Sequence, residues 1–141
     1  MFIKNKAIQI RSTKESEVID ITEIVSRVMK ESKMVNGIIT VFVKGSTAAI
    51  TTIEYEPGLL TDFPEMLSRI APKNVRYAHD GAWRDGNGHS HVRASLIGPS
   101  LTIPFVDGNL TLGTWQQIVF IEMDIRPRER TLVIQIIGDN N

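Results

Sequence analysis

The stretches Ile118-Val-Phe-Ile-Glu-Met-Asp-Ile125 and Thr131-Leu-Val-Ile-Gln-Ile-Ile137 decide the class of fold. Both are apolar, of strand length and rich in β-branched residues, which is typical of strands buried in a sheet. The polar segment between them, residues 126–130, contains Pro127 and predicts a turn. Its arginines could bind a phosphate, but we interpret the segment as a solvated hairpin tip.

Further strands are predicted on both sides of these stretches by alternating or β-branched apolar residues. They are Phe2 to Ile10, Glu17 to Ile21, Ile38 to Val43, Ala48 to Tyr55, His91 to Ile97, Leu101 to Val106 and Leu110 to Leu112. We expect the first two to form an opening strand pair.

Two helices are predicted by apolar residues at helical spacing. The first begins behind Asp20, with Glu23 completing a capping box, and stops at Asn36-Gly37. The second runs from Leu59 to Ile70. It should start near Thr61 or Asp62, because a proline such as Pro64 is tolerated only in the first turn. The predicted class is α+β, a largely antiparallel sheet or sandwich covered by two main helices.

Composition limits both the architecture and the partners. The chain has 141 residues, enough for one domain covering residues 1–141. Lysine plus arginine and aspartate plus glutamate number 16 each, so no overall charge recruits nucleic acid or a membrane. Cysteine is absent, and no apolar stretch has the length of a signal peptide or a membrane span. We expect a cytoplasmic, soluble protein.

The three histidines, His79, His89 and His91, lie close together in the sequence. On a strand, His89 and His91 would point to the same face, and His79 could return to them across a glycine-rich loop. Neutral imidazoles are good ligands for zinc, whereas magnesium prefers oxygen. The pattern therefore predicts a divalent metal site, with zinc preferred over magnesium. The alternative is a solvated loop whose imidazoles bond to the backbone.

Several motifs resemble those of the YjbQ-like family, uncharacterised protein family 0047, often labelled secondary thiamine-phosphate synthase. The motifs are Gly45-Ser-Thr-Ala-Ala-Ile-Thr-Thr-Ile-Glu54, Tyr77-Ala-His79, Asn87 to His91, Ala94-Ser-Leu-Ile-Gly-Pro-Ser100, Leu101-Thr-Ile-Pro104, Leu112-Gly-Thr-Trp-Gln116 and Val133-Ile-Gln-Ile-Ile-Gly138. The resemblance implies a homotrimer and a site near a cleft between subunits. The family positions that it matches are Glu54, His79, His91, Ser100, Trp115, Gln116 and Glu122. Many relatives carry a histidine where this chain has Gly45, and His89 could substitute for it.

The label implies the joining of a pyrimidine diphosphate to a thiazole phosphate with loss of pyrophosphate. Such a reaction needs a group that neutralises the negative charge of the departing pyrophosphate. Glu54, Asp85 and Glu122 could supply oxygen ligands, and Arg93, two residues after His91, could meet a phosphate on a regular strand. A small phosphorylated or heterocyclic ligand is therefore expected.

Two other functions stay open. Three imidazoles around zinc would activate a water for hydrolysis, with Glu54 as general base unless it faces solvent. A non-catalytic trimer that binds a metal or a small ligand is the other. Trp115 and Gln116 could stack on and orient a heterocycle, although a tryptophan filling the core or an interface is the interpretation we prefer. Ser100 could donate to a phosphate or belong to an ordinary turn.

Overall fold

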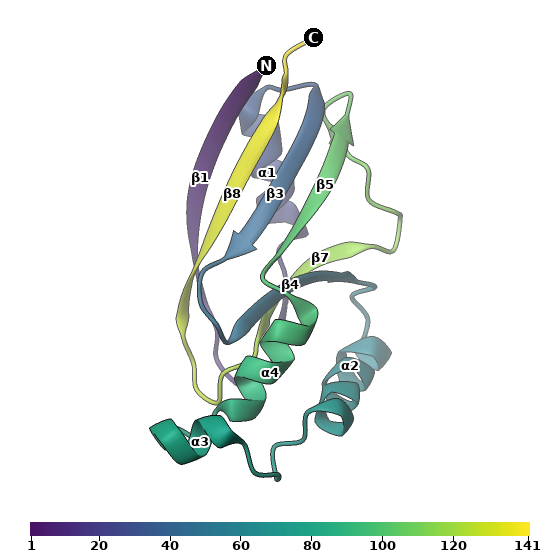
Figure 1. Cartoon of the computed structure of the whole chain (residues 1–141). Coiled ribbons are helices and arrows are strands. Elements are labelled where there is room, and N and C mark those ends of the chain that lie inside the picture. The colour runs from purple at the N-terminus through teal and green to yellow at the C-terminus, as the bar shows by residue number, and fades with distance from the viewer.

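A computed structural model describes residues 1–141 and contains eight strands and four helices (Figure 1). In chain order these are β1 (Phe2–Arg11), β2 (Val18–Asp20), α1 (Thr22–Ser32), β3 (Asn36–Val43), β4 (Ala48–Ile53), α2 (Pro57–Ile70), α3 (Ala78–Trp83), α4 (Gly88–Ile97), β5 (Ser100–Val106), β6 (Asn109–Leu110), β7 (Gln117–Glu122) and β8 (Glu129–Asp139). The longest helix, α2, has 14 residues, which is too short to cross a bilayer.

The strands form two antiparallel sheets, which confirms the predicted α+β class. The larger sheet has the order β1-β8-β3-β5-β6 and the smaller one the order β2-β7-β4. Both ends of the chain lie side by side in the larger sheet, because β1 pairs with β8 from Phe2 opposite Gly138 to Arg11 opposite Glu129. The predicted opening pair is wrong, since β2 crosses to the smaller sheet and pairs with β7.

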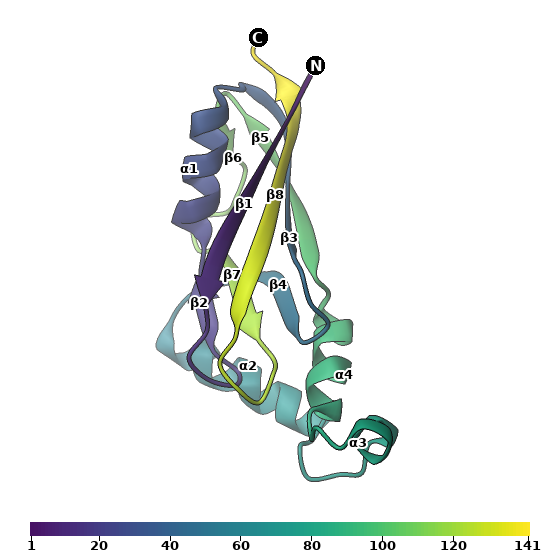
Figure 2. The same cartoon turned by 90° about the vertical axis from the view of Figure 1, so that its left-hand side faces the viewer.

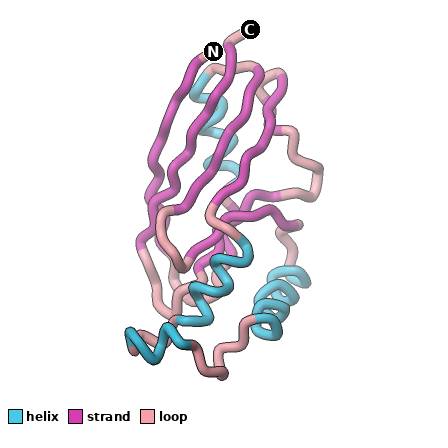
Figure 3. The backbone as a smooth tube through the Cα atoms, viewed as in Figure 1, coloured by secondary structure: helices cyan, strands magenta, loops and turns pink.

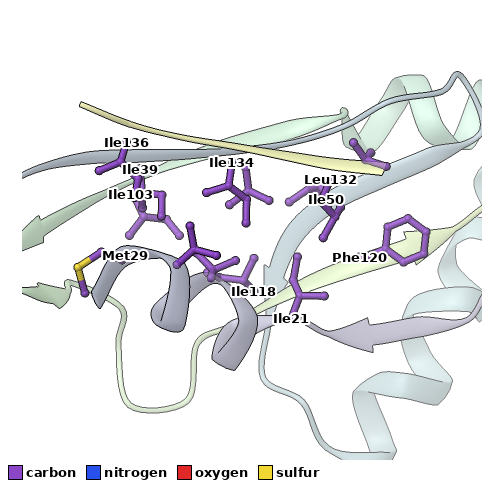
Figure 4. Close-up of a cluster of buried hydrophobic side chains, with 14 of the residues drawn as sticks. Ile21, Met29, Ile39, Ile50, Ile103, Ile118, Phe120, Leu132, Ile134 and Ile136 are labelled. Carbon is purple, nitrogen blue, oxygen red and sulfur yellow. The ribbon is translucent and has the colours of Figure 1, made fainter. Parts of the chain in front are cut away.

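The main core lies between the larger sheet and α1, which covers only one of its faces (Figure 2). Ile39, Ile134 and Ile136 point from the strands toward Met29 and Ile21 at the helix (Figure 4). All five are buried, and each contributes about 1.5–3 kcal/mol by leaving water. These strands were predicted from alternating apolar and polar residues. In the structure, the apolar side chains of this pattern point into the core, and the side chains between them point to the opposite face of the sheet.

A smaller core holds α2 and α4 against the three-stranded sheet. It consists of Ala49, Leu67, Ala94, Val119, Ile121 and Met123. The tube trace separates this helical end of the molecule from the long strands (Figure 3). Because Ala94 is part of this core, the smaller cluster fixes where α4 lies, and α4 carries two of the three histidines.

The predicted first and second helices are confirmed as α1 and α2, but their ends differ. Asp20 accepts hydrogen bonds from the backbone and hydroxyl of Thr22, so no capping box forms with Glu23. The helix stops at Lys33 in a left-handed conformation, and Asn36 already belongs to β3. In α2 the cap is Glu56, which accepts from the N–H groups of Gly58 and Leu59. Pro64 therefore lies inside that helix, beyond its first turn.

The strand predicted from His91 to Ile97 is wrong, because residues 88–97 form α4. Helix α3, which carries His79, was not predicted either, so the protein has four helices and not two. The buried residues of α4 include the polar side chains of His89, Ser90 and Arg93. Its sequence therefore lacks apolar residues that recur every 3.6 positions. Such recurrence is the main sequence signal for a helix.

Candidate functional site

His79 and His91 meet where α3 and α4 come together at the lower end of the molecule (Figure 1). Their ring centroids are 4.4 Å apart and the ring planes are tilted by 54°. Gly88 at the start of α4 permits this approach, since a Cβ there would lie only 2.5 Å from the Cβ of Tyr77. The backbone N–H of Gly88 also donates to Asp80 of α3, at 2.9 Å.

Asp85 and Asn87 complete the surroundings of His79. The Nε2 atom of His79 lies 3.1 Å from Asp85 Oδ1 and 3.0 Å from the side-chain amide of Asn87. When its nitrogen faces them, the amide donates to both Asp85 oxygens at 3.0 and 3.2 Å and to His79. Nε2 then accepts, so its lone pair and the Asp85 carboxylate both face the Asn87 amide, and a cation bound by the two groups would take the place of that amide.

This arrangement suits a cation. His79, Asp80 and Asp85 each offer a ligand atom, and these atoms all lie within 4.8 Å of one another. Two ligands of a tetrahedral zinc ion, each about 2.0–2.1 Å from it, are about 3.3 Å apart. The 3.1 Å between His79 Nε2 and Asp85 Oδ1 is close to that separation. An imidazole nitrogen with carboxylate oxygens is a donor set that several divalent cations accept, zinc among them.

A polar cleft of about 320 Å³ opens beside this cluster, and none of its lining residues is hydrophobic. The lining consists of Gly45, Ser46, Thr47, Asp85, Asn87, His91, Asp124, Arg128 and Arg130. A second cleft of about 170 Å³ shares Gly45, Ser46 and His91 with it. His91 therefore borders both spaces, and its ring nitrogens are not engaged by other side chains of the protein.

The floor of the polar cleft consists of two ion pairs. Arg128 contacts Asp124 through Nε at 3.0 Å and Nη2 at 2.8 Å. Burial alone would raise the pKa of the Asp124 carboxyl, but hydrogen bonds from the Ile125 N–H and from Arg128 outweigh burial and lower it. Arg130 pairs with the fully buried Glu122, with Nη2 2.5 Å from Oε1. The predicted solvated tip is thus wrong for Arg130, which is 7% exposed.

His89 lies away from the other two histidines. It is 1% exposed, and its Nε2 lies 2.5 Å from Glu15 Oε1. The prediction that His89 and His91 point to the same face required a strand. On a helix, two residues add a rotation of about 200° about the axis, so the two side chains point to nearly opposite sides. His89 therefore ties α4 to the loop before β2, while His91 faces the cleft.

Arg93 also follows from the helical geometry. It is buried, and its Nε donates to the backbone oxygen of Ala71 at 3.0 Å. The side chain holds α4 against the end of α2 and does not share a face with His91, so the strand geometry from which a phosphate ligand was expected is wrong.

Glu54, Ser100, Trp115 and Gln116 are not brought to the histidines. Ser100 and Gln116 line a separate cleft of about 350 Å³ between β4, β5 and the loop before β7. Trp115 is 71% exposed in this chain, so it does not fill the core. Glu54 is exposed just after β4, as its solvent-facing interpretation implies.

Sequence reasoning considered the arginines of residues 126–130 as phosphate ligands but preferred a solvated tip, and it did not place them at the histidines. Arg128 reaches the cleft from the connection before β8, Arg130 from the start of β8, and Thr47 from the loop before β4. A signal was present, because Glu122 and Asp124 interrupt an apolar run at alternate positions. Buried carboxylates need partners, and the arginines follow directly after them in the sequence.

Comparison with known proteins places these features in a family. A model of the family described as UPF0047 protein YjbQ-like matches residues 6–139. A UPF0047 protein of Methanothermobacter thermautotrophicus is 40% identical, over 98% of this chain and 94% of the relative. The UPF0047 protein YugU of Bacillus subtilis is 33% identical, over 94% of this chain and 98% of the relative.

Solved structures agree with the sequence comparison. A hypothetical protein from Aeropyrum pernix superposes with a TM-score of 0.90 at 34% identity, over 96% of this chain and 99% of that one. A YbjQ-like protein of unknown function from Sulfolobus solfataricus has a TM-score of 0.88 at 31% identity, over 98% of this chain and 100% of that one. The sequence match over nearly the whole chain, together with the shared fold, shows that this protein belongs to the UPF0047/YjbQ-like family.

Proposed function

We propose that this protein is a metal-dependent enzyme that uses a divalent cation, zinc rather than magnesium, to act on a small polar substrate in the cleft beside His91. One observation carries the proposal: His79 Nε2 and the Asp85 carboxylate lie 3.1 Å apart. Asn87, which is buried, keeps the two groups together. An imidazole nitrogen and a carboxylate that converge in this way are typical of metal ligands.

Zinc supplies a nucleophile at neutral pH by lowering the pKa of bound water to about 7. The chain contributes the remaining parts of a hydrolytic site. His79 and Asp85 hold the cation, with Asp80 within reach. His91 lies beside His79 and borders the cleft, which suits it to move a proton to or from the substrate. Glu54 has no part in this scheme, because it does not line the cleft.

Metal content tests the first part of the proposal. Protein purified without added metal, then equilibrated with zinc and dialysed, should retain one zinc per chain by elemental analysis. His79→Ala and Asp85→Asn should each retain less than a tenth of that amount. His89→Gln is the matched control, because it removes an imidazole from the same region but outside the cluster. Equal zinc retention in all four proteins would contradict the site.

Turnover tests the second part. p-Nitrophenyl phosphate and p-nitrophenyl acetate are simple probes for hydrolysis of phosphate and carboxylate esters. Zinc-loaded protein should hydrolyse at least one of them, and His91→Gln should lower kcat about 100-fold while leaving zinc content unchanged. Full zinc occupancy with no turnover on any substrate would favour a non-catalytic metal-binding protein.

Thiamine-phosphate synthase activity is the second candidate. The two adjoining clefts favour it, because they share His91 and could receive two different molecules. The absence of hydrophobic residues from the larger cleft disfavours it, since a pyrimidine ring usually stacks on an apolar or aromatic surface. The test supplies the pyrimidine diphosphate and thiazole phosphate and measures pyrophosphate release against His79→Ala. Release at the same rate in both proteins would remove this candidate.

A homotrimer is the assembly we propose for the active protein. The larger sheet supports self-association, because α1 covers one of its faces and no helix covers the long strands on the other (Figures 1 and 2). Ile38 and Phe42 of β3 are about two-fifths exposed on that open face. Apolar side chains that are exposed together on a sheet commonly mark an interface.

A further inference from the structure

Arg130 is nearly buried but does not use its whole guanidinium group within the chain. Nε donates to Glu122, and Nη2 donates to Glu122 and to the backbone and hydroxyl oxygens of Thr47. Nη1 donates to no side chain or backbone group, and it is not among the polar atoms sealed from solvent. Arg130 lines the polar cleft, so Nη1 is a fixed donor on the cleft floor.

Gly45 keeps this donor accessible. A Cβ built on Gly45 would lie 2.7 Å from Arg130 Nη1, closer than two such atoms can approach. Gly45 also has a φ of 121°, a backbone angle that residues other than glycine rarely adopt. The backbone N–H groups of Gly45, Ser46 and Thr47 form no hydrogen bond within the chain. The loop therefore leaves donors free around the guanidinium.

Arg128 adds a second partly free guanidinium to the same cleft. It contacts Asp124 through Nε and Nη2, which leaves its Nη1 without a partner. The charges of Glu122 and Asp124 are already matched by the two arginines. A divalent cation at His79 and Asp85 would offset the negative charges of Asp80 and Asp85, so that no excess negative charge would oppose the binding of an anion.

We propose that Arg130 Nη1, Arg128 and the Ser46 hydroxyl form a subsite for the phosphoryl group of a small phosphorylated substrate. This inference rests on the proposed metal-dependent function and names the class of its substrate. Arginine suits the role because its planar guanidinium forms charge-assisted hydrogen bonds to phosphate oxygens. The ion pair with Glu122 holds Arg130 in place, so little side-chain entropy is lost when the phosphoryl group binds.

Calorimetric titration with inorganic phosphate and with methyl phosphate tests the subsite. Truncating Arg130 would leave Glu122 buried without its partner and could unfold the protein, so two other substitutions serve. Gly45→Ala places a methyl group against Nη1, and Arg128→Gln removes the second guanidinium. Each should weaken the binding of both ligands at least tenfold, with urea-unfolding midpoints checking the fold. Arg126→Gln, an exposed arginine of the same connection that does not line the cleft, should change the affinity less than twofold.

The titration is run on zinc-loaded and zinc-free protein, and zinc content is measured for each variant. Equal loss of affinity in Arg128→Gln and Arg126→Gln would overturn the subsite, because general charge would then explain binding. Binding of inorganic phosphate without methyl phosphate would also overturn it. A wild-type protein that retains no zinc but still binds phosphate through Arg128 would contradict the proposed function and leave the subsite standing.

Discussion

Glu122 and Arg130 form an ion pair that is almost entirely removed from water. Glu122 is 0% exposed and also accepts hydrogen bonds from Ser12 and from the backbone N–H of Asp124. Every oxygen of the carboxylate is therefore satisfied, which offsets the cost of burying the charge. The same contacts fix the guanidinium at the cleft floor, so this pair joins the stability of the protein to the geometry of its site.

Arg130→Met should lower the free energy of unfolding by about 3–5 kcal/mol, because it leaves Glu122 buried without a counterion. Urea unfolding followed by circular dichroism measures the change. Arg126→Gln, which alters an exposed arginine nearby, should change the same quantity by less than about 0.5 kcal/mol. A similar small effect of both substitutions would show that the pair does not contribute as its burial implies.

The two histidines of α4 lie on opposite sides of the helix and have different contacts. His91 borders the cleft, whereas His89 contacts Glu15, which also pairs with Lys73 at 2.9 Å. These contacts join α4, the loop before β2 and the segment after α2. The position of His91 therefore depends on interactions made at the opposite side of its own helix.

Two glycines test how closely α3 and α4 must approach. A Cβ at Gly88 would collide with Tyr77, whereas a Cβ at Gly81 in α3 would meet nothing within 4 Å. Gly88→Ala should cost about 1–3 kcal/mol of unfolding free energy through overpacking and should reduce zinc retention. Gly81→Ala should increase the unfolding free energy by about 0.5–1 kcal/mol through helix propensity and keep the zinc. Zinc loss in both variants, or in neither, would contradict the close approach.

The Glu15 contacts predict a dependence of stability on pH. Burial raises the pKa of the Glu15 carboxyl, but the hydrogen bonds from His89 and Lys73 outweigh it and place the pKa below its ordinary value of 4.5. Glu15 therefore stabilises the fold above that value, and the contribution is lost as the pH falls through the lowered pKa. In thermal unfolding between pH 6 and pH 3, Glu15→Gln should lose less stability than the wild type. Lys14→Gln, a change to the same loop that removes no acidic group, should follow the wild-type slope.

The elements that sequence predicted correctly have one apolar face and one polar face. In β3, Ile39, Val41 and Val43 are buried, and Ile38 and Phe42 alternate with them. The alternation is visible locally, because it reflects a single layer of packing. Helix α4 could not be found in this way, since polar residues occupy much of its buried surface.

The site was only partly predictable for a related reason. His79, His89 and His91 lie near one another in the sequence, so their residue types predicted a metal centre, and Asp85 was a candidate oxygen ligand. That His89 leaves the group follows only from the helix on which it lies. Thr47 and Arg128 come from the loops before β4 and β8, and Arg130 comes from the start of β8. Their place in the cleft depends on how the two sheets are assembled, and no local pattern contains that information.

The open face of the larger sheet has apolar rows on either side of a polar one. Ile3, Ile137 and Ile38 are neighbours across β1, β8 and β3, and so are Ala7, Val133 and Phe42. Between these rows, Asn5 accepts from Gln135 at 2.8 Å, and Thr40 and Thr102 bond to each other at 2.8 Å. Burial of such a face in an oligomer would remove the apolar rows from water and leave the polar row satisfied.

Phe42→Glu should therefore dissociate the proposed trimer. Three copies would bring three carboxylates into an apolar contact, and desolvation of an unpaired charge costs more than the interface gains from one side chain. Sedimentation equilibrium should give three times the chain mass of 15.8 kDa for the wild type and the chain mass for the variant. Lys44→Glu is the control, because it changes an exposed residue just beyond the end of β3 by a larger charge difference. A monomeric wild type, or a trimeric Phe42→Glu protein, would show that this face is not where the subunits meet.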